Sequence, residues 1–490
     1  MILIWFALIP LAGALISLAL EKIKEEAAGA IALISTAATF ILSLYAPHLT
    51  LAARHIVYRT GGWEIPLGIT LILDGFGAFI LVIINLVFFV VTIYSISYIR
   101  KRYTASARFF VLFLFCAAGL NGVALSGDIF NFYVFVEMVA LSSYSLVAFG
   151  AEREDLEASI RYQMLGTLGS FFILLGIGFL YSVTGTLDFG DMSRVIKQTG
   201  ITLPVMFSVP LLLFGFALKV ALVPFHAWLP DAYPTAPAPV TAVLAGVVSK
   251  VVGIYGIVRI FFGVIGMNFV MYQILLYAGI ISIFFGAFAA LAQTDFKRLL
   301  AYSSISQIGY VMLGLGIGTP VGIAGALFHA LNHATFKSLY FLSAGAVEES
   351  AGTRNLDELG GLSEKMPVTT FSSLFASFSL AGVPPFGGFW SKALIIFACI
   401  LAGKNLIAVL VALASVLTLA YFLKIQRKAF FSKLPEGLVN IKESPVLMCV
   451  AMVIMALVCL GLGLGVDYVM DILIKPAANS LLIGTGYGNL

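Results

Sequence analysis

Charged residues are scarce in this sequence. Asp, Glu, Lys and Arg make up 11% of its 490 residues, against roughly 25% in soluble domains, whereas 61% of the residues are hydrophobic. A chain with so little charge cannot cover a large soluble domain with polar surface, so we expect a polytopic membrane protein embedded in the lipid bilayer. The net charge of +4 is modest and gives no indication of a nucleic-acid partner.

Cysteine is also scarce, and its spacing excludes the common cofactor sites. The four cysteines lie inside apolar stretches and have neither metal-ligand nor iron–sulfur spacing: Cys116, Cys399, Cys449 and Cys459. The sequence also lacks a Gly-x-x-x-x-Gly-Lys-Ser/Thr phosphate loop and a strand–GxGxxG–helix unit. We therefore expect no cofactor and no redox centre in this chain, so an ion gradient or partner subunits must drive any work that it does.

Long apolar runs are abundant. A membrane-spanning helix needs about 20 apolar residues, and the runs predict an all-α protein with fourteen spans. The predicted spans lie near residues 2–20, 28–46, 74–99, 108–126, 129–150, 160–183, 205–230, 237–263, 269–292, 299–317, 321–346, 369–402, 407–424 and 445–466. The first run lacks a basic leading segment and a small-residue cleavage site, so we expect a span there and not a cleaved signal peptide.

Proline breaks the seventh and the twelfth span. The motif LVPFHAW at 222–228 resembles VPPFGGFW at 383–390, and each lies inside a long apolar run. The two breaks are five spans apart, so the units around them would have opposite topology, which predicts inverted repeats with discontinuous helices. The match is short, and the lysines do not superpose, because Lys219 precedes its break and Lys392 follows its own.

Basic residues predict the orientation. Lys and Arg gather in one alternating set of loops, such as residues 100–102 and 424–433, while Arg259 belongs to the sparser opposite set. This bias predicts that the first set is cytoplasmic at the plasma membrane and that both termini lie outside. Residues 49–73 alternate apolar and polar around Gly61, which predicts an external β-hairpin. The predicted units are residues 1–107 with three spans, 108–263 with spans 4–8, 264–431 with spans 9–13, and 432–490 with the last span and a tail.

Two charges of opposite sign inside apolar spans suggest an ion pair. Glu137 lies in the fifth predicted span and Lys219 in the seventh. A lysine in hydrocarbon costs about 3 kcal/mol on insertion scales, so such residues usually face a bundle interior or a water-filled path. One hypothesis is a switch in which Lys219 holds its proton while Glu137 is near and releases it when Glu137 withdraws. The alternative is a static pair that joins two helices, which would stabilise the fold only weakly.

Further ionisable residues continue this pattern. Lys250 and Lys392 lie in the eighth and twelfth spans and are candidate relay groups, although Lys392 could also reach an interface by snorkelling. His329, His333 and Lys337 are spaced four residues apart and therefore share one helix face. Histidine suits proton transfer near neutrality, and hydrogen bonds across helices are the structural alternative. A zinc site is disfavoured, because no Glu follows the first His and a lysine lies one turn further on.

Four polar residues are additional candidates for the relay. His226 follows the first break and either bridges Lys219 to Lys250 or binds freed carbonyls of the broken helix. Ser303 and Ser304 in the tenth span either line water or bond back to their own helix. The last candidate is Lys424, at the end of the thirteenth span.

Several of these motifs together resemble the antiporter-like subunit family. That family comprises the D and A subunits of Mrp sodium/proton antiporters, the large membrane-arm subunits of respiratory complex I, and the equivalent subunits of membrane-bound hydrogenases and sulfane-sulfur reductases. The resemblance covers roughly residues 70–430. The runs that carry it are GDIFNFYVFVE, LKVALVPFHAWLPDAYPTAPAPVTAVLAGVVSK, SKVVGIY, DFKRLLAYSSISQIGY, FHALNHATFKSLYFLSAG and AGVPPFGGFWSK.

The resemblance implies fourteen spans, two inverted five-helix repeats (spans 4–8 and 9–13), broken seventh and twelfth helices and a hydrated polar axis. Its implied partners are other membrane subunits, including homologous antiporter-like and small Mrp-type subunits. The proton-path residues that match the family motifs are Glu137, Lys219, Lys250, His329, His333, Lys337 and Lys392.

Four functions remain open from the sequence. The first is a proton-translocating subunit of a redox-driven membrane complex, which is favoured because the stretch VPFHAWLPDAYPTAPAPV looks closer to the complex-I-like and hydrogenase-linked members of that family than to stand-alone Mrp subunits. The second is the D subunit of an Mrp-type sodium/proton antiporter. The third is a structural subunit without its own ion path, and the fourth is an independent solute transporter, which would work when expressed alone.

Overall fold

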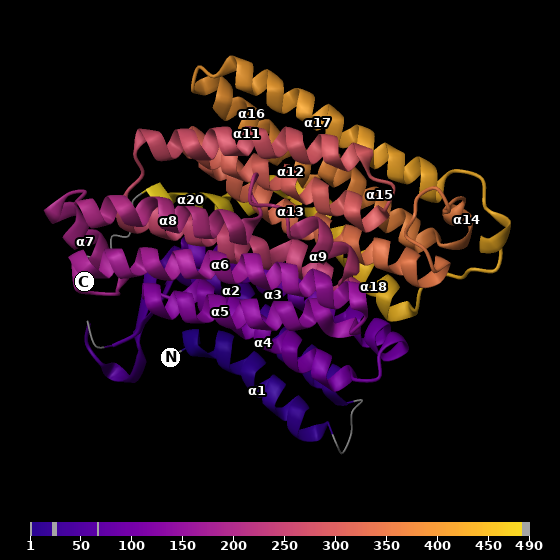
Figure 1. The fold of residues 1–490 in the computed structure, drawn as a ribbon, viewed down its shortest axis with the longest axis horizontal. Helices are drawn as coiled ribbons and strands as arrows, with labels where there is room; N and C mark the ends of the chain where they lie inside the picture. The colour runs from indigo at the N-terminus through magenta and orange to yellow at the C-terminus, as the bar shows by residue number, and fades with distance from the viewer. Residues whose placement is uncertain (1, 22–26, 66–67, 483–490) are drawn as a thin grey trace.

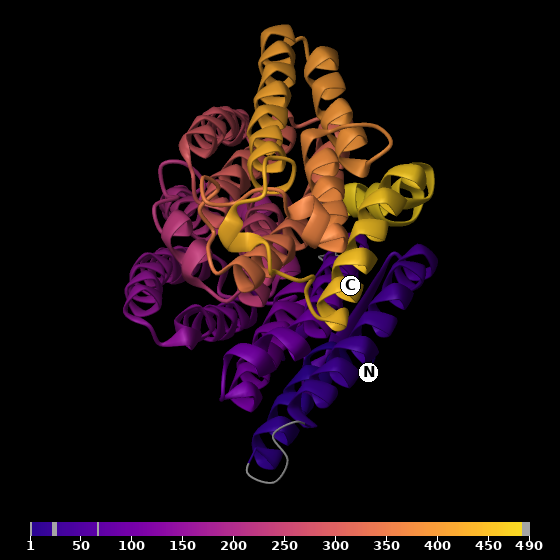
Figure 2. The ribbon, with the colours of Figure 1, turned by 90° about the vertical axis from the view of Figure 1, so that its right-hand side faces the viewer.

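The computed structural model describes residues 2–21, 27–65 and 68–482. Within them, twelve helices are long and apolar enough to cross a membrane, and they run side by side in one bundle (Figure 1). Seen along the bundle, α1 (Trp5–Leu20) lies at one flank, and α16 (Gly387–Leu401) and α17 (Asn405–Ile425) lie at the other (Figure 2). The predicted all-α membrane fold is thus confirmed, whereas the count of fourteen spans and the repeats stay predictions.

The N-terminal part and the region of the first predicted repeat follow each other along the chain. The first comprises η1 (Ile2–Ile4), α1, α2 (Ala27–Ala53), β1 (His55–Arg59), η2 (Thr60–Gly62), β2 (Thr70–Asp74) and α3 (Gly75–Arg102). The second comprises α4 (Ser106–Leu125), α5 (Ile129–Val147), η3 (Ala148–Gly150), α6 (Arg153–Thr184), α7 (Phe189–Thr199), α8 (Leu203–Val220), α9 (Leu229–Thr235), α10 (Ala238–Val243), η4 (Leu244–Val248), η5 (Lys250–Tyr255) and η6 (Val258–Ile265).

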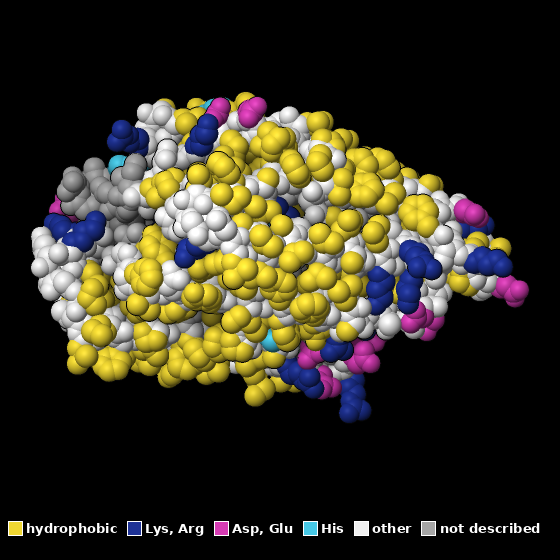
Figure 3. All heavy atoms as spheres, turned by 90° about the horizontal axis from the view of Figure 1, so that it is seen from above, with side chains coloured by type: hydrophobic (Ala, Val, Ile, Leu, Met, Phe, Trp, Pro, Cys, Tyr) yellow, Lys and Arg dark blue, Asp and Glu magenta, His cyan; other side chains and the backbone are white. Residues whose placement is uncertain are grey.

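The remaining elements complete the bundle. They are α11 (Phe269–Ala292), α12 (Phe296–Ile317), α13 (Pro320–Ala351), α14 (Leu362–Lys365), α15 (Pro367–Ala381), α16, α17, η7 (Gln426–Phe430), η8 (Glu436–Leu438), α18 (Val446–Leu464), α19 (Val466–Val469), η9 (Met470–Ile474) and α20 (Lys475–Leu482). The centre of the molecule is α13, which packs against α10, α12, α15, α16 and α18. The face formed by α11, α16 and α17 is apolar over its middle and carries most of its charges toward the two ends, as a bilayer requires (Figure 3).

The predicted hairpin is present in the described residues. β1 pairs antiparallel with β2, with His55 opposite Asp74. Gly61 and Gly62 have φ of 68° and 76°, and this left-handed conformation favours glycine at the turn that follows β1. The Asp74 carboxylate then accepts a hydrogen bond of 2.7 Å from the Gly77 amide, which caps α3.

The helix break near Pro224 is present, and local contacts satisfy its backbone. α8 ends at Val220, and Ala221 is left-handed with φ of 59°. The Val223 amide donates to Ser282 Oγ of α11 at 3.1 Å, and Trp228 Nε1 donates to the Leu218 carbonyl at 2.9 Å. These contacts meet the requirement that backbone groups freed at membrane depth find protein partners.

The second break separates α15 from α16. Gly382 ends α15 with φ of 85°, and the Val383 amide donates to the Phe378 carbonyl at 3.0 Å. Each of the two breaks contains one cis peptide bond before proline, at Val223–Pro224 and at Pro384–Pro385.

Two basic residues are buried in helices although their positions beside apolar runs predicted loops, with Arg259 in the sparser set of loops and Lys297 in the more basic set. Arg259 lies in η6 and makes a paired contact with the Asp74 carboxylate at 2.7 and 3.0 Å. Lys297 lies in the first turn of α12 and forms an ion pair of 2.5 Å with Glu348. Both residues flank apolar runs, so a loop assignment was natural, but each carboxylate partner lies far away in the sequence and holds the cation inside the bundle.

Candidate functional site

The pairing of Glu137 with Lys219 is present. Lys219 Nζ lies 3.8 Å from Glu137 Oε1, and the Ser170 hydroxyl of α6 donates to the same carboxylate. The Lys219 side chain is only 6% exposed, whereas that of Glu137 is 30% exposed. The carboxylate therefore lies at the outer surface of this chain, while the lysine is enclosed by it.

Lys219 owes its position to the break in α8. It occupies the last turn of α8, immediately before the chain leaves the helix. Across from this turn, Gly253 of η5 lies so close to Val220 that an added Cβ would come within 2.5 Å of the Val220 Cβ. The close approach brings the helix that carries Lys219 against the segment that carries Lys250.

Lys250 lies in an unusual part of the chain. Residues 244–248, 250–255 and 258–265 are wound as π-helix inside one almost wholly buried span, Ala238–Ile265. π-Helical turns are rare and are often found at functional sites. Lys250 is 4% exposed, and its ammonium has no hydrogen-bond partner among the described residues.

The predicted histidine face lies in the middle of α13, near Lys250. His329, His333 and Lys337 are fully buried, and the charge of Lys250 acts on all three. Lys337 Nζ donates to the Ser303 hydroxyl and, at 2.9 Å, to the Leu300 carbonyl. In the described part of the chain, no group of three or more His, Cys, Asp or Glu side chains could hold a metal ion.

The two histidines differ in their contacts. His329 Nδ1 lies 3.0 Å from Ser391 Oγ, and the Ser391 hydroxyl donates to the Gly388 carbonyl. The serine oxygen is thus left to accept from Nδ1, which makes Nε2 the acceptor nitrogen of a neutral His329. Neither nitrogen of His333 has a partner among the described residues. Both rings therefore offer a nitrogen that can receive a proton.

Lys392 lies at the far end of this row of residues. Its ammonium donates to the Leu380 carbonyl at 2.8 Å and lies 5.0 Å from the centre of the Tyr310 ring. The Leu380 carbonyl belongs to the last turn of α15, where freed carbonyls favour a cation. The Tyr310 ring in turn lies 5.3 Å from the ring of His329. Lys392 is thus held by a helix end and an aromatic face, whereas Lys219 faces a carboxylate.

Unpartnered buried polar atoms follow the row. Within the described residues they include Lys219 Nζ, Lys250 Nζ, His329 Nε2, both nitrogens of His333, both side-chain atoms of Gln307 and Asn332 Oδ1. Most buried polar groups in proteins have a partner, and ordered water often provides it. Water bound beside these residues could supply the missing partners.

The four additional candidates for the relay differ in their burial and in their contacts. His226 is half-buried, its Nδ1 has no partner among the described residues, and its ring packs on Phe285 at 4.4 Å. Ser303 and Ser304 both donate back to the Leu300 carbonyl of their own helix, at 2.8 and 3.0 Å, and Ser303 also accepts from Lys337. Lys424 donates to the Leu291 and Gln293 carbonyls at the end of α11.

Sequence reasoning did not single out Tyr310 or Ser391. An aromatic residue in an apolar span resembles a packing residue, and a serine near a break resembles a capping residue, so neither type gave a signal. For Ser391, its position in the sequence could have served as a signal, because it directly precedes the candidate relay residue Lys392.

The sequence of this chain is similar to those of known membrane proteins. The family model described as NADH:quinone oxidoreductase/Mrp antiporter, TM, matches residues 126–418. The chain is 36% identical over 383 residues to the N subunit of the NADH-quinone oxidoreductase of Desulforudis audaxviator, covering 77% of this chain and 76% of that protein. It is 35% identical over 417 residues to the D subunit of the Na(+)/H(+) antiporter of Alkalihalophilus pseudofirmus, covering 83% and 82% respectively.

Two solved structures are similar over nearly the whole chain. One is the Mrp complex from Dietzia sp., with a TM-score of 0.91, 27% identity and coverage of 99% of this chain and 98% of that chain. The other is the membrane-bound sulfane sulfur reductase, an archaeal respiratory membrane complex, with a TM-score of 0.89, 29% identity and the same coverage.

Proposed function

We propose that this chain, which belongs to the NADH:quinone oxidoreductase/Mrp antiporter family of membrane proteins, moves protons as an antiporter-like subunit of a redox-driven complex in the plasma membrane. The observation that carries the proposal is the row of Lys, His and Glu side chains in which Lys219 Nζ, Lys250 Nζ, His329 Nε2 and both nitrogens of His333 are buried without a hydrogen-bond partner among the described residues. Relatives and structural neighbours named as parts of multisubunit membrane complexes support a role beside other membrane subunits.

In the proposed mechanism, the proton path starts at the pair of Glu137 and Lys219. Lys219 keeps its proton while the carboxylate lies nearby, because a buried ammonium needs a counter-charge. Glu137 can withdraw toward a partner subunit, since its side chain is partly exposed at the surface of the chain. The free energy of the proton is then lower on a neighbouring group than on Lys219. Water in the path carries the proton to Lys250.

The second half of the proposed path uses the histidines. Lys250 lies near His329 and His333, whose free nitrogens accept the proton. From His329, the path continues past the Tyr310 ring to Lys392 at the end of α15. Ser303 and Lys337 flank the path, and His226 and Lys424 remain candidates for its connections to the two sides of the membrane.

Proton flux in sealed vesicles tests this function. The assembled complex with Lys219→Ala is compared with the wild type and with Lys197→Ala, a matched control on the surface helix α7. We expect Lys219→Ala to lower proton flux at least tenfold while the complex and its partner reaction stay intact, and the control to leave both unchanged. Unchanged flux in Lys219→Ala would show that the lysine is structural.

The second candidate is the D subunit of an Mrp-type sodium/proton antiporter. The 35% identity over 417 residues to the antiporter protein and the TM-score of 0.91 to the Mrp complex favour it. In this function the same row would exchange protons for sodium, beside homologous and small Mrp-type subunits. Proton flux that requires sodium on the opposite side of the vesicle membrane would support the antiporter, and sodium-independent flux would support the redox-driven complex. A purely structural role instead predicts that Lys219→Ala alters assembly and not flux.

A further inference from the structure

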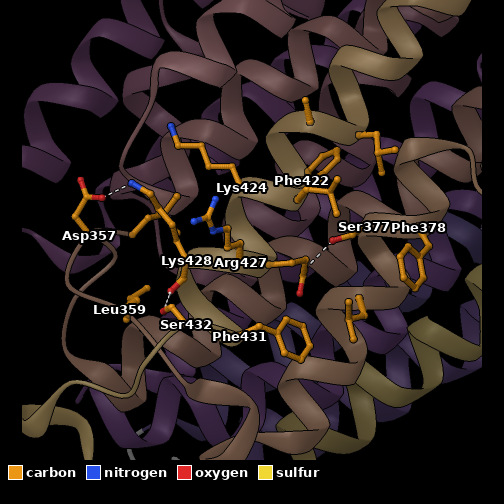
Figure 4. A pocket seen from close by; sticks show the side chains of 16 residues that line it. Asp357, Leu359, Ser377, Phe378, Phe422, Lys424, Arg427, Lys428, Phe431 and Ser432 are labelled. Carbon is orange, nitrogen blue, oxygen red and sulfur yellow. Dashed lines mark hydrogen bonds and ion pairs between the residues drawn. The ribbon is translucent and has the colours of Figure 1, made fainter.

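A cavity of about 990 Å³ opens at the end of the bundle between α15, α17 and the loop that precedes α14. The residues of the row from Glu137 to Lys392 do not line it, although Lys424, a candidate for the connection of the proton path to one side of the membrane, does. Figure 4 shows Lys424, Arg427 and Lys428 on one side of this cavity and Phe378 on the other. One large pocket thus combines a cationic side with an apolar side.

Positive charges outnumber negative charges on the cationic side of the cavity. Its three cations face a single lining carboxylate, Asp357, which pairs with Lys428. Lys424 is committed to the Leu291 and Gln293 carbonyls. The guanidinium of Arg427, by contrast, forms no hydrogen bond or ion pair with any described residue, and the residue is exposed. The pocket therefore offers a guanidinium that is free to bind an anion, beside two further positive charges.

A second observation points to a ligand in the same pocket. Gln426 lines the cavity and is 5% exposed. Its amide nitrogen donates to the hydroxyls of Ser373 and Ser377 at 2.8 Å, but its carbonyl oxygen has no donor among the described residues. A buried acceptor without a donor is costly, so this oxygen calls for a hydroxyl or another donor from outside the chain.

The apolar side leads from the pocket toward the bilayer. Leu374 and Phe378 of α15 face Leu419 and Leu423 of α17 across the cavity. Phe378 and Leu423 are 37% and 53% exposed, so this wall is open along the outer surface of the bundle. The outward face of α17 continues it with exposed apolar side chains such as Leu413 and Val416. An alkyl chain can therefore lie between α15 and α17 and run on into the lipid.

We propose that this pocket binds an anionic phospholipid, with its phosphate at Arg427 and Lys428 and an acyl chain between α15 and α17. The pocket lies on the side that the positive-inside bias assigns to the cytoplasm, and basic pockets between spans on that side commonly bind anionic headgroups. A phospholipid with a hydroxylated headgroup also supplies the donor for Gln426. A helix of a neighbouring subunit that offers a carboxylate to the guanidinium is the competing occupant, which the experiment below distinguishes from a lipid.

Photo-crosslinking in vesicles tests the proposal. The assembled complex is reconstituted with photoactivatable phosphatidylglycerol or phosphatidylcholine, and labelled peptides of this chain are quantified by mass spectrometry. The variants are Arg427→Gln, which removes the free cation, and Leu374→Trp, which fills the acyl groove. Lys433→Gln and Leu457→Trp on α18 are the matched controls, because each makes a similar change at an exposed position outside the cavity and on neither α15 nor α17.

We expect phosphatidylglycerol to label the peptides of α15 and α17 that line the pocket, and phosphatidylcholine to label them several-fold less. Arg427→Gln should lower phosphatidylglycerol labelling about fivefold, as expected for one basic residue near an anionic lipid, and Leu374→Trp should also lower it. Equal labelling by the two lipids, or labelling unchanged in both variants, would overturn the proposal. Crosslinks from the pocket to a protein subunit in place of lipid would overturn it as well.

Discussion

The pair of Glu137 and Lys219 gives a quantitative test of the proposed switch. At 3.8 Å, two unit charges attract each other by about 4 kcal/mol at an effective dielectric constant of 20. Glu137 is partly exposed, so solvent screens part of this attraction, and about half of it remains as a working value. A coupling of about 2 kcal/mol corresponds to a factor of roughly 30 in rate, at 1.4 kcal/mol per tenfold.

A double-mutant cycle measures this coupling. Initial proton flux is recorded in sealed vesicles for the wild type, Glu137→Gln, Lys219→Met and the double variant, all at the same driving force. We expect each single variant to lower flux at least tenfold, because each breaks the same switch. The double variant should then be no slower than the worse single variant, so that the cycle returns a coupling near a factor of 30.

Multiplicative effects would refute this reasoning. If the double variant loses the product of the two single losses, the two groups act independently and the pair is not a functional unit. Ser170→Ala is the internal control for geometry, because it removes a hydrogen bond from Glu137 but leaves both charges in place. Its effect on flux should be several-fold smaller than that of either charge removal.

The remaining predictions concern other parts of the row and its support. Tyr310→Phe should keep most proton flux because the ring beside Lys392 remains, whereas Tyr310→Leu should lower flux about tenfold, as expected from a lost cation–π contact of about 1–2 kcal/mol. Arg259→Met should lower the melting temperature strongly, because an unpaired buried carboxylate costs about 3–5 kcal/mol, and adding Asp74→Leu should restore most of the loss. Gly253→Val should destabilise the complex and lower flux, because the new side chain collides with the end of α8.

Each of these predictions has a control or an opposing result. Gly178→Val is the matched control for the buried glycine, because an added Cβ at Gly178 would meet nothing within 4 Å. Equal flux in the Tyr310 Phe and Leu variants would show that the ring has no role. A double variant of Asp74 and Arg259 that is less stable than either single variant would show that the ion pair does more than balance its own buried charges.

The sequence predicted those parts of the fold that depend on local chemistry. Apolar length alone placed the ninth span at 269–292, and the structure has α11 at Phe269–Ala292. Proline in apolar sequence predicted both breaks, since proline cannot continue a helix's hydrogen bonds. The approach of Lys219 to Glu137 followed from opposite charges that both needed a partner away from lipid.

Other features depend on tertiary contacts and left no local signal. The π-helical winding around Lys250 cannot be read from an apolar run, because the same residues suit an α-helix. The amphipathic helix α7, Phe189–Thr199, lies between the spans predicted near 160–183 and 205–230, where no helix was predicted. The position of Arg259 depends on Asp74, which is distant in sequence. The role of Tyr310 depends on Lys392 and His329, which reach it from other helices.

The two ends of the proposed path differ in how exposed their surroundings are, and this difference indicates at which end a partner subunit can influence the path. Lys392 is enclosed, with its ammonium on the α15 carbonyls and near the Tyr310 ring, so no exposed group acts on it directly. Lys219 is also enclosed, but its counter-charge Glu137 is partly exposed at the surface of the chain. A charge or a helix movement in a partner subunit can therefore reach the first lysine through Glu137 and cannot reach the second in the same way. In this arrangement a driving reaction elsewhere in a complex would act at the Glu137 end, and the Lys392 end would respond through the histidines between them.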